Sequence, residues 1–137
     1  MKSRTRTAMD WLQYLPFAAG CVAIYLVSDM PRPPVPDALT FRFADKLLHA
    51  GAYGVLSLLA LLGAAHRRGG IAQRARVEAV ALAGLYGVVD ELHQSFVPNR
   101  SATVSDVVAD VIGAMLAMAA VAAWRKRAGS KRPPRAT

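Results

Sequence analysis

Long apolar runs constrain this chain more than any other feature. The first run, Trp11 to Ser28, holds no charged residue, and three similar runs follow it. About 20 apolar residues in a helix are enough to cross the hydrocarbon core of a bilayer. Apolar residues make up 54% of the 137 residues and are concentrated in these runs, which is more than a soluble domain usually has. The sequence therefore predicts a membrane protein.

The predicted fold is all-α, a four-helix transmembrane bundle that occupies residues 11–125. The helices are expected near residues 11–28, 46–65, 77–96 and 103–124. Thr103 with Asp106 matches the [ST]xx[DE] capping pattern, which places the start of the fourth helix. Residues 1–10 form a basic N-terminus, and residues 126–137 are expected to be a basic, disordered tail because they contain Pro133 and Pro134.

The first run also has features of a cleaved lipoprotein signal. Residues 18–21 read Ala-Ala-Gly-Cys after a basic start, but Leu is absent three residues before Cys21 and the apolar run continues to Val27. We therefore expect a retained helix with Cys21 as a small buried apolar residue. A single cysteine excludes an intramolecular disulfide and a CxxC metal site.

The basic residues predict the orientation of the helices. Of 17 Lys and Arg, three precede the first run, four lie in the loop between the second and third runs, and six follow the fourth run. Positive charge marks the cytoplasmic side of a membrane, so both termini are predicted to be cytoplasmic, with loops 29–45 and 97–102 outside. The net charge of +8 lies in these flanks, a placement that argues against a nucleic-acid partner.

This topology gathers the polar residues of the helices at the outer end of the bundle. Seven of the nine acidic residues lie on that side. The candidate ligand-binding or polar-core residues there are Asp45, Lys46, His49, Asp90, Glu91, His93, Gln94, Arg100, Asp106 and Asp110. Ionisable groups inside a membrane face the bundle interior, find partners and are commonly functional.

An ordinary interfacial polar layer is the alternative interpretation. Asp45 and Asp106 lie at helix N-termini, where the helix dipole alone favours an acid. The trio Glu91, Arg100 and Asp110 is harder to explain in this way. We expect Arg100 to pair with Glu91 or Asp110, in a pair that either fixes helix register or belongs to a functional site.

The ligand spacing gives little support for a metal. Asp90 and His93 are three residues apart, a carboxylate–histidine spacing found in di-metal bundles, and His49, Glu91 and Asp110 converge from other positions. No second such motif and no HExxH accompanies them. We predict no metal site and no cofactor, with Asp90 and His93 the candidates if a metal binds. Phosphate loops and nucleophile motifs are also missing from the sequence.

Taken together, the polar motifs resemble those of the VanZ-like membrane protein family. The matching segments are Asp45-Lys46-Leu47-Leu48-His49 with Tyr53, Tyr86-Gly87, Asp90-Glu91-Leu92-His93-Gln94, Phe96-Val97-Pro98-Asn99-Arg100, and Asp106, Asp110 and Gly113. The resemblance implies a small multi-pass protein of the bacterial plasma membrane. It also carries the family's polar positions onto Asp45, Lys46, His49, Glu91, Gln94, Arg100, Asp106 and Asp110.

Two positions depart from the family pattern. The family often has Gly where this chain has Asn99, and Asn where this chain has Asp110. Asn also tolerates a left-handed turn, so the hairpin between the last two helices should survive. The additional charge of Asp110 strengthens the expectation of a cationic partner.

The resemblance suggests a link to glycopeptide susceptibility, because the family takes its name from a member linked to teicoplanin resistance. The outer polar residues are compatible with three functions. The first is a protein that modulates the envelope and binds an envelope lipid or a glycopeptide ligand at its outer site, with Lys46 and Arg100 meeting phosphate or carboxylate. The alternative is a membrane enzyme acting on a lipid-linked envelope substrate through Glu91 or Asp90 with His49 or His93. A structural subunit is the third. The ligand and the oligomeric state are left open.

Overall fold

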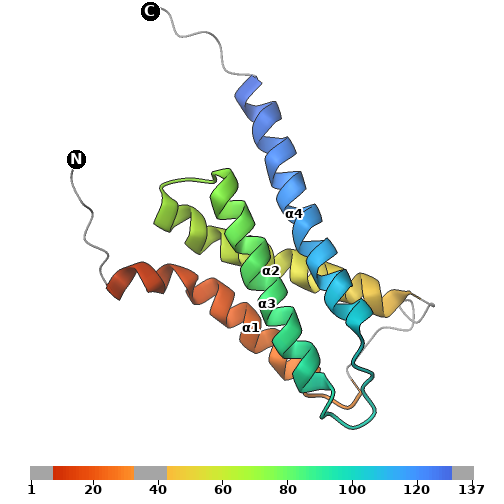
Figure 1. Cartoon of the computed structure of the whole chain (residues 1–137). Helices are drawn as coiled ribbons and strands as arrows, with labels where there is room; N and C mark the ends of the chain where they lie inside the picture. The colour runs from red at the N-terminus through yellow and green to blue at the C-terminus, as the bar shows by residue number, and fades with distance from the viewer. Residues whose placement is uncertain (1–7, 33–42, 131–137) are drawn as a thin grey trace, which may run out of the picture.

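A computed structural model of the chain describes residues 8–32 and 43–130, with side chains from Trp11 onward. The described residues form helices and no strand. The elements are η1 (Ala8–Tyr14), α1 (Leu15–Ser28), α2 (Ala44–Arg68), α3 (Gln73–Gln94) and α4 (Val104–Ser130). The predicted all-α fold with four helices is confirmed, and η1 is a 3₁₀ lead-in to α1 (Figure 1).

The helix ends differ from the predicted ones at the basic segments. α2 continues to Arg68, where three basic residues complement the helix dipole, and it stops at Gly69, which has a φ of 73°. α4 continues to Ser130, so the first part of the expected disordered tail is helical. Arg and Lys are good helix formers, which explains why a basic sequence alone does not end a helix. The rest of the tail lies outside the described residues.

Three of the helical segments are long and apolar enough to cross a membrane. These segments are Trp11–Ser28, Ala44–Arg68 and Val104–Ser130. α3 is not among them, since it carries Arg74, Arg76 and Glu78 in its first turns and Asp90 and Glu91 near its end. It contacts α1, α2 and α4, while its Leu85 and Leu92 side chains are exposed, so the least apolar helix packs against the other three along one face only (Figure 1).

Small side chains make up much of the interior of the bundle. Ala60 and Ala64 of α2 and Ala75 and Ala79 of α3 are fully buried in one cluster. Large apolar side chains of the same helices point outward, as Leu62 and Leu85 do. Helix pairs in membranes pack through small residues because lipid tails are as apolar as leucine. The bundle therefore has the exposed apolar surface expected of a protein surrounded by lipid.

Polar contacts at one end of the bundle join the end of η1, the end of α2 and the start of α3. Tyr14 and Arg67 both contact Glu78, and Arg68 Nε donates to the same carboxylate at 2.7 Å. Arg125 of α4 contacts the carbonyl of Ile71 at this end. We call this the basic end; the end of η1, the end of α2, the start of α3 and the later turns of α4 lie at this end of the bundle.

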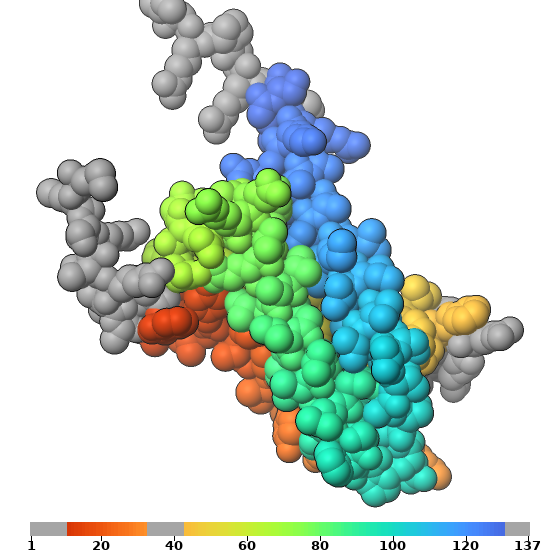
Figure 2. Space-filling view, viewed as in Figure 1, coloured from red at the N-terminus to blue at the C-terminus, as the bar shows by residue number. Residues whose placement is uncertain are grey.

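The opposite end, which we call the acidic end, is joined by a second set of contacts. They link Ser28 of α1 to Gln94, Lys46 of α2 to Asp106, and the backbone of Thr103 to Glu91. The last turns of α3 and the first turns of α4 lie against each other here (Figure 2). The predicted up-and-down arrangement therefore holds within the bundle, and the cytoplasmic placement of its basic end stays a prediction from charge.

Candidate functional site

α2 and α4 approach each other closely near the acidic end of the bundle, and this approach positions the polar side chains there. A Cβ added to Gly54 would lie 3.3 Å from the carbonyl oxygen of Gly113, and one added to Gly113 would collide with the backbone of Ala50. Only glycine permits backbones to come this close. His49 directly precedes Ala50, and Asp110 lies three residues before Gly113; the Nδ1 atom of His49 and the Oδ1 atom of Asp110 are 2.9 Å apart. Asp110 is the most buried of the described acids, with 1% of its surface exposed.

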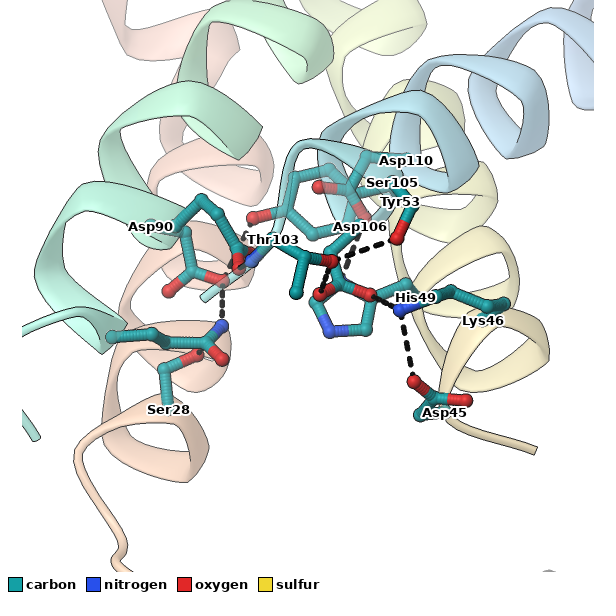
Figure 3. Close-up of polar contacts among 12 residues, drawn as sticks. Ser28, Asp45, Lys46, His49, Tyr53, Asp90, Thr103, Ser105, Asp106 and Asp110 are labelled. Atoms are coloured by element: carbon teal, nitrogen blue, oxygen red, sulfur yellow. Dashed lines mark hydrogen bonds and ion pairs between the residues drawn. The ribbon is translucent and has the colours of Figure 1, made fainter. Parts of the chain in front are cut away.

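Asp106, one turn before Asp110 on α4, is held by two donors. The ammonium of Lys46 contacts its Oδ1 atom and also lies 2.9 Å from Asp45. The hydroxyl of Thr103 donates to its Oδ2 atom at 2.6 Å. Lys46 thus bridges an exposed acid and a buried one, which lowers the free-energy cost of burying the Asp106 carboxylate (Figure 3).

Glu91 joins α3 to the start of α4. Its Oε1 atom accepts the backbone N–H of Thr103 at 2.6 Å. In the predicted capping box an acid within α4 itself would take this N–H, whereas here the acid comes from the neighbouring helix. The other oxygen, Oε2, is buried and has no hydrogen-bond partner among the described residues. Only 7% of the Glu91 surface is exposed, and one of its two carboxylate oxygens has no hydrogen-bond partner among the described residues.

These side chains form one cluster. A nitrogen of His49 and one oxygen each of Glu91 and Asp106 all lie within 4.8 Å of one another. We call the cluster the acidic site and define it as Lys46, His49, Glu91, Asp106 and Asp110. Residues from three helices contribute to it, and α2 and α4 contribute most (Figure 3).

A second network lies beside the acidic site and joins α1, α2 and α3. The Oδ2 atom of Asp90 accepts from the hydroxyl of Tyr53 at 3.0 Å and from Nε2 of Gln94 at 2.9 Å. Gln94 also donates to Ser28 at 3.3 Å, and its amide oxygen accepts from Arg100 at 2.9 Å. We call these five residues the Asp90 network; its Asp90 Oδ1 and Arg100 Nε atoms are buried without hydrogen-bond partners in the described part of the chain.

A comparison with protein families identifies the family of this chain. A family model described as VanZ/LLP1 matches residues 3–125. The chain belongs to the VanZ/LLP1 family. No curated protein and no solved structure matches it. The match confirms the resemblance seen in the sequence, and in this VanZ/LLP1 chain it covers both the acidic site and the Asp90 network.

One predicted pair is wrong in this VanZ/LLP1 protein. Arg100 was expected to bind Glu91 or Asp110, but its guanidinium donates to Gln94, while Asp110 binds His49. The backbone N–H of Arg100 bonds to Val97, so the turn after α3 folds back toward the end of that helix. In place of the cationic partner expected for Asp110, the imidazole of His49 on α2 contacts its carboxylate.

The spacing of Asp90 and His93 does not bring them to one metal site. Asp90 binds Tyr53 and Gln94 in the interior, whereas the His93 ring lies 4.7 Å from the ring of Tyr25. His93 Nε2 is 3.2 Å from Asp29, close enough for an ion pair but without hydrogen-bond geometry. Among the described residues, the three grouped ligands are instead His49, Glu91 and Asp106.

Three residues at the two networks were not among the predicted site residues. Tyr53 supplies a buried hydroxyl to Asp90, Thr103 bonds both Glu91 and Asp106, and Ser28 ends α1 against Gln94. Tyr53 gave a signal in the sequence, because it lies on the same helix face as Asp45 and His49 at a spacing of four. Ser28 gave none, since its role depends on how α1 lies against α3.

Proposed function

We propose that this VanZ/LLP1 protein modulates the bacterial cell envelope by binding the polar group of an envelope lipid or a related ligand at a site formed by the acidic site and the adjoining Asp90 network. The observation that carries the proposal is a set of buried carboxylates at one end of the bundle with unsatisfied oxygens. Asp90, Glu91 and Asp110 each keep one buried oxygen without a hydrogen-bond partner among the described residues. Such oxygens are costly to bury, and a ligand that donates to them would offset that cost.

The charges favour a ligand rich in donors. Lys46, expected to meet a phosphate or carboxylate, already lies between two acids. Arg100 keeps a buried Nε atom free of hydrogen bonds in the described structure and would take an anionic oxygen. The acids outnumber these cations, so hydroxyl, amide or ammonium groups are the main groups that we expect the site to bind. Polar lipid headgroups and glycopeptides both present such groups.

The predicted orientation supports the same proposal. The described basic end holds the Arg-rich α2–α3 turn and the basic turn of α4, so the positive-inside rule places that end in the cytoplasm of a multi-pass protein. The acidic site would then face the outer leaflet of the bacterial inner membrane. Envelope lipids and glycopeptides such as teicoplanin are accessible from that side.

A complementation experiment tests this function. A strain lacking the protein would receive the wild type, Glu91→Gln, Arg100→Ala or the exposed-charge control Arg74→Gln, each at matched membrane levels. We expect teicoplanin susceptibility and envelope-lipid composition to return to those of the deletion strain with the two site variants, and to remain wild type with the control. Wild-type readouts from both site variants would rule the proposal out.

A membrane enzyme is the second candidate, and the His49–Asp110 pair favours it. A carboxylate 2.9 Å from an imidazole orients that imidazole for proton transfer, and Glu91 is close by as an acid or base. Asp90 and His93, the other residues considered for catalysis, contact different partners. Incubating the purified protein and its His49→Gln variant with lipid-linked envelope substrates, with and without divalent metal, tests this candidate. Absence of turnover by the wild type under all conditions rejects it.

A further inference from the structure

We propose that the acidic site binds one divalent ion of the Zn²⁺ or Mn²⁺ class through His49, Glu91 and Asp106. One donor atom from each residue lies within 4.8 Å of the other two, a spacing that allows a single ion to contact all three. The donors come from three different helices, so the fold rather than a local motif assembles them. Both carboxylates are buried, unlike the exposed acidic groups that gather by chance on protein surfaces.

The unsatisfied oxygen of Glu91 points independently to a ligand. Thr103 uses only Oε1, and Oε2 is buried with no hydrogen-bond partner in the described residues. An ionised oxygen removed from water in this way is costly unless it is paired or coordinates a metal. Asp110 behaves similarly, with Oδ1 on His49 and Oδ2 unsatisfied.

The groups around the three donors resemble the outer shell of a metal site. Metal-binding histidines usually contact a carboxylate with their second ring nitrogen, and His49 makes such a contact with Asp110 at 2.9 Å. Coordinating carboxylates are in turn hydrogen-bonded, as Asp106 is by Thr103 and Lys46. Asp106 retains lone pairs on both oxygens for an ion, since each carboxylate oxygen accepts twice.

Charge balance supports a divalent ion. Within the acidic site, the three carboxylates of Glu91, Asp106 and Asp110 face one ammonium, that of Lys46. Two negative charges are left when His49 is neutral, and one divalent ion neutralises them. A buried cluster of this charge is more stable with the ion than without it.

The donor set limits the identity of the ion. One imidazole nitrogen and two carboxylate oxygens suit Zn²⁺ or Mn²⁺, whereas Mg²⁺ and Ca²⁺ prefer oxygen ligands alone. Three protein donors leave coordination positions open. If the proposed function holds, an oxygen of the envelope ligand would fill one of these open positions. The metal site itself does not depend on the proposed function; only the identity of this additional ligand rests on it.

Metal titration of the purified full-length chain in detergent tests the inference without any envelope ligand. After removal of metal with EDTA, the protein would be titrated separately with ZnCl₂ and MnCl₂. We expect one ion per chain, and a loss of affinity on the order of tenfold to a hundredfold or more in His49→Gln, Glu91→Gln and Asp106→Asn. Asp90→Asn removes a neighbouring buried acid and should retain the ion, while Lys46→Met should bind it more tightly.

The wild type provides a measurement that does not depend on any variant folding. Pulsed EPR of the bound Mn²⁺ should show coupling to an imidazole nitrogen, and bound Co²⁺ should show the visible absorption of a site with nitrogen and oxygen donors. Substoichiometric binding of both ions, or absence of the nitrogen coupling, would overturn the inference. So would a Glu91→Gln variant that binds as the wild type does. None of these results would affect the complementation experiment, so failure of the metal site and failure of the proposed function are distinguishable.

Discussion

Each buried acid in the described part of the chain has a hydrogen-bond or ion-pair partner from outside its own helix. Asp110 has His49, Asp106 has Lys46 and Thr103, and Asp90 has Tyr53 and Gln94. Removing one partner leaves a buried oxygen with fewer hydrogen bonds, which costs more than the hydrogen bond itself contributes. Individual residues can therefore be tested for stability separately from function.

Tyr53→Phe removes the hydroxyl that donates to Asp90 and keeps the ring in place. We expect a loss of about 1 kcal/mol in unfolding free energy, because Asp90 keeps its bond to Gln94. Thermal unfolding in detergent measures it. Tyr25→Phe is the matched control, since the Tyr25 side chain is largely exposed. Equal melting temperatures for the Tyr53 variant and the wild type would show that the Asp90 network does not stabilise the bundle.

Asn99 adopts a left-handed conformation in the turn between α3 and α4, with a φ of 63°. Asn99→Gly should leave stability nearly unchanged, because glycine adopts this conformation freely. Asn99→Val should cost about 1–2 kcal/mol, since its branched Cβ crowds the following carbonyl. Thermal unfolding of the wild type and the two variants measures these effects. The prediction fails if the valine variant has the same melting temperature as the wild type.

Among the helices, the approach of α2 to α4 decides the geometry of the acidic site. The contact occurs where Gly113 faces the backbone of Ala50, which directly follows His49, and Gly113 lies three residues after Asp110. Any side chain inserted at this contact separates the two helices that carry most of the site. α3 then completes the site by presenting Glu91 to the first residues of α4.

Gly113→Ala should therefore destabilise the bundle and weaken the site together. Its methyl group would collide with the Ala50 backbone, and overpacking of this kind costs about 1–3 kcal/mol. Gly51→Ala is a matched control on α2, because nothing lies within 4 Å of the added Cβ and alanine favours the helix. Melting temperatures and Mn²⁺ affinity of both variants provide the measurement. A Gly113 variant as stable as the Gly51 variant would contradict the close contact.

At the scale of the whole molecule, charge and polarity are separated along the bundle. Arg67, Arg68 and Arg125 make their contacts at the basic end, and the buried acids of the described residues gather at the opposite end. Apolar side chains cover much of the surface between the two ends, as expected for lipid contact. This separation makes the orientation in the membrane a question that labelling can answer.

Cysteine labelling tests the predicted orientation. In a Cys21→Ser background, Ser101→Cys lies in the exposed turn before α4 and Arg74→Cys in the exposed first turn of α3. A membrane-impermeant maleimide should label the first in intact cells and the second only after permeabilisation, because positive charge stays in the cytoplasm. The opposite labelling pattern would invert the topology and place the acidic site in the cytoplasm.

The sequence determined the all-α class, the four helices, the membrane environment and the end at which the polar residues gather. These properties depend on the length and composition of each segment, which a single chain shows directly. The capping pattern at Thr103 placed the start of α4 to within one residue. The resemblance to the family was confirmed by the match over residues 3–125.

The tertiary structure alone decided which partner each polar residue has. Sequence spacing predicted that Asp90 lies with His93 and that Arg100 pairs with an acid. In the structure Asp90 and Arg100 both bind Gln94. The His93 ring lies against Tyr25 instead. Partners depend on how each helix is rotated about its axis and how closely it approaches the next. The contact at Gly113 sets both for α2 and α4, and no local pattern in the sequence specifies that His49 should meet Asp110 there.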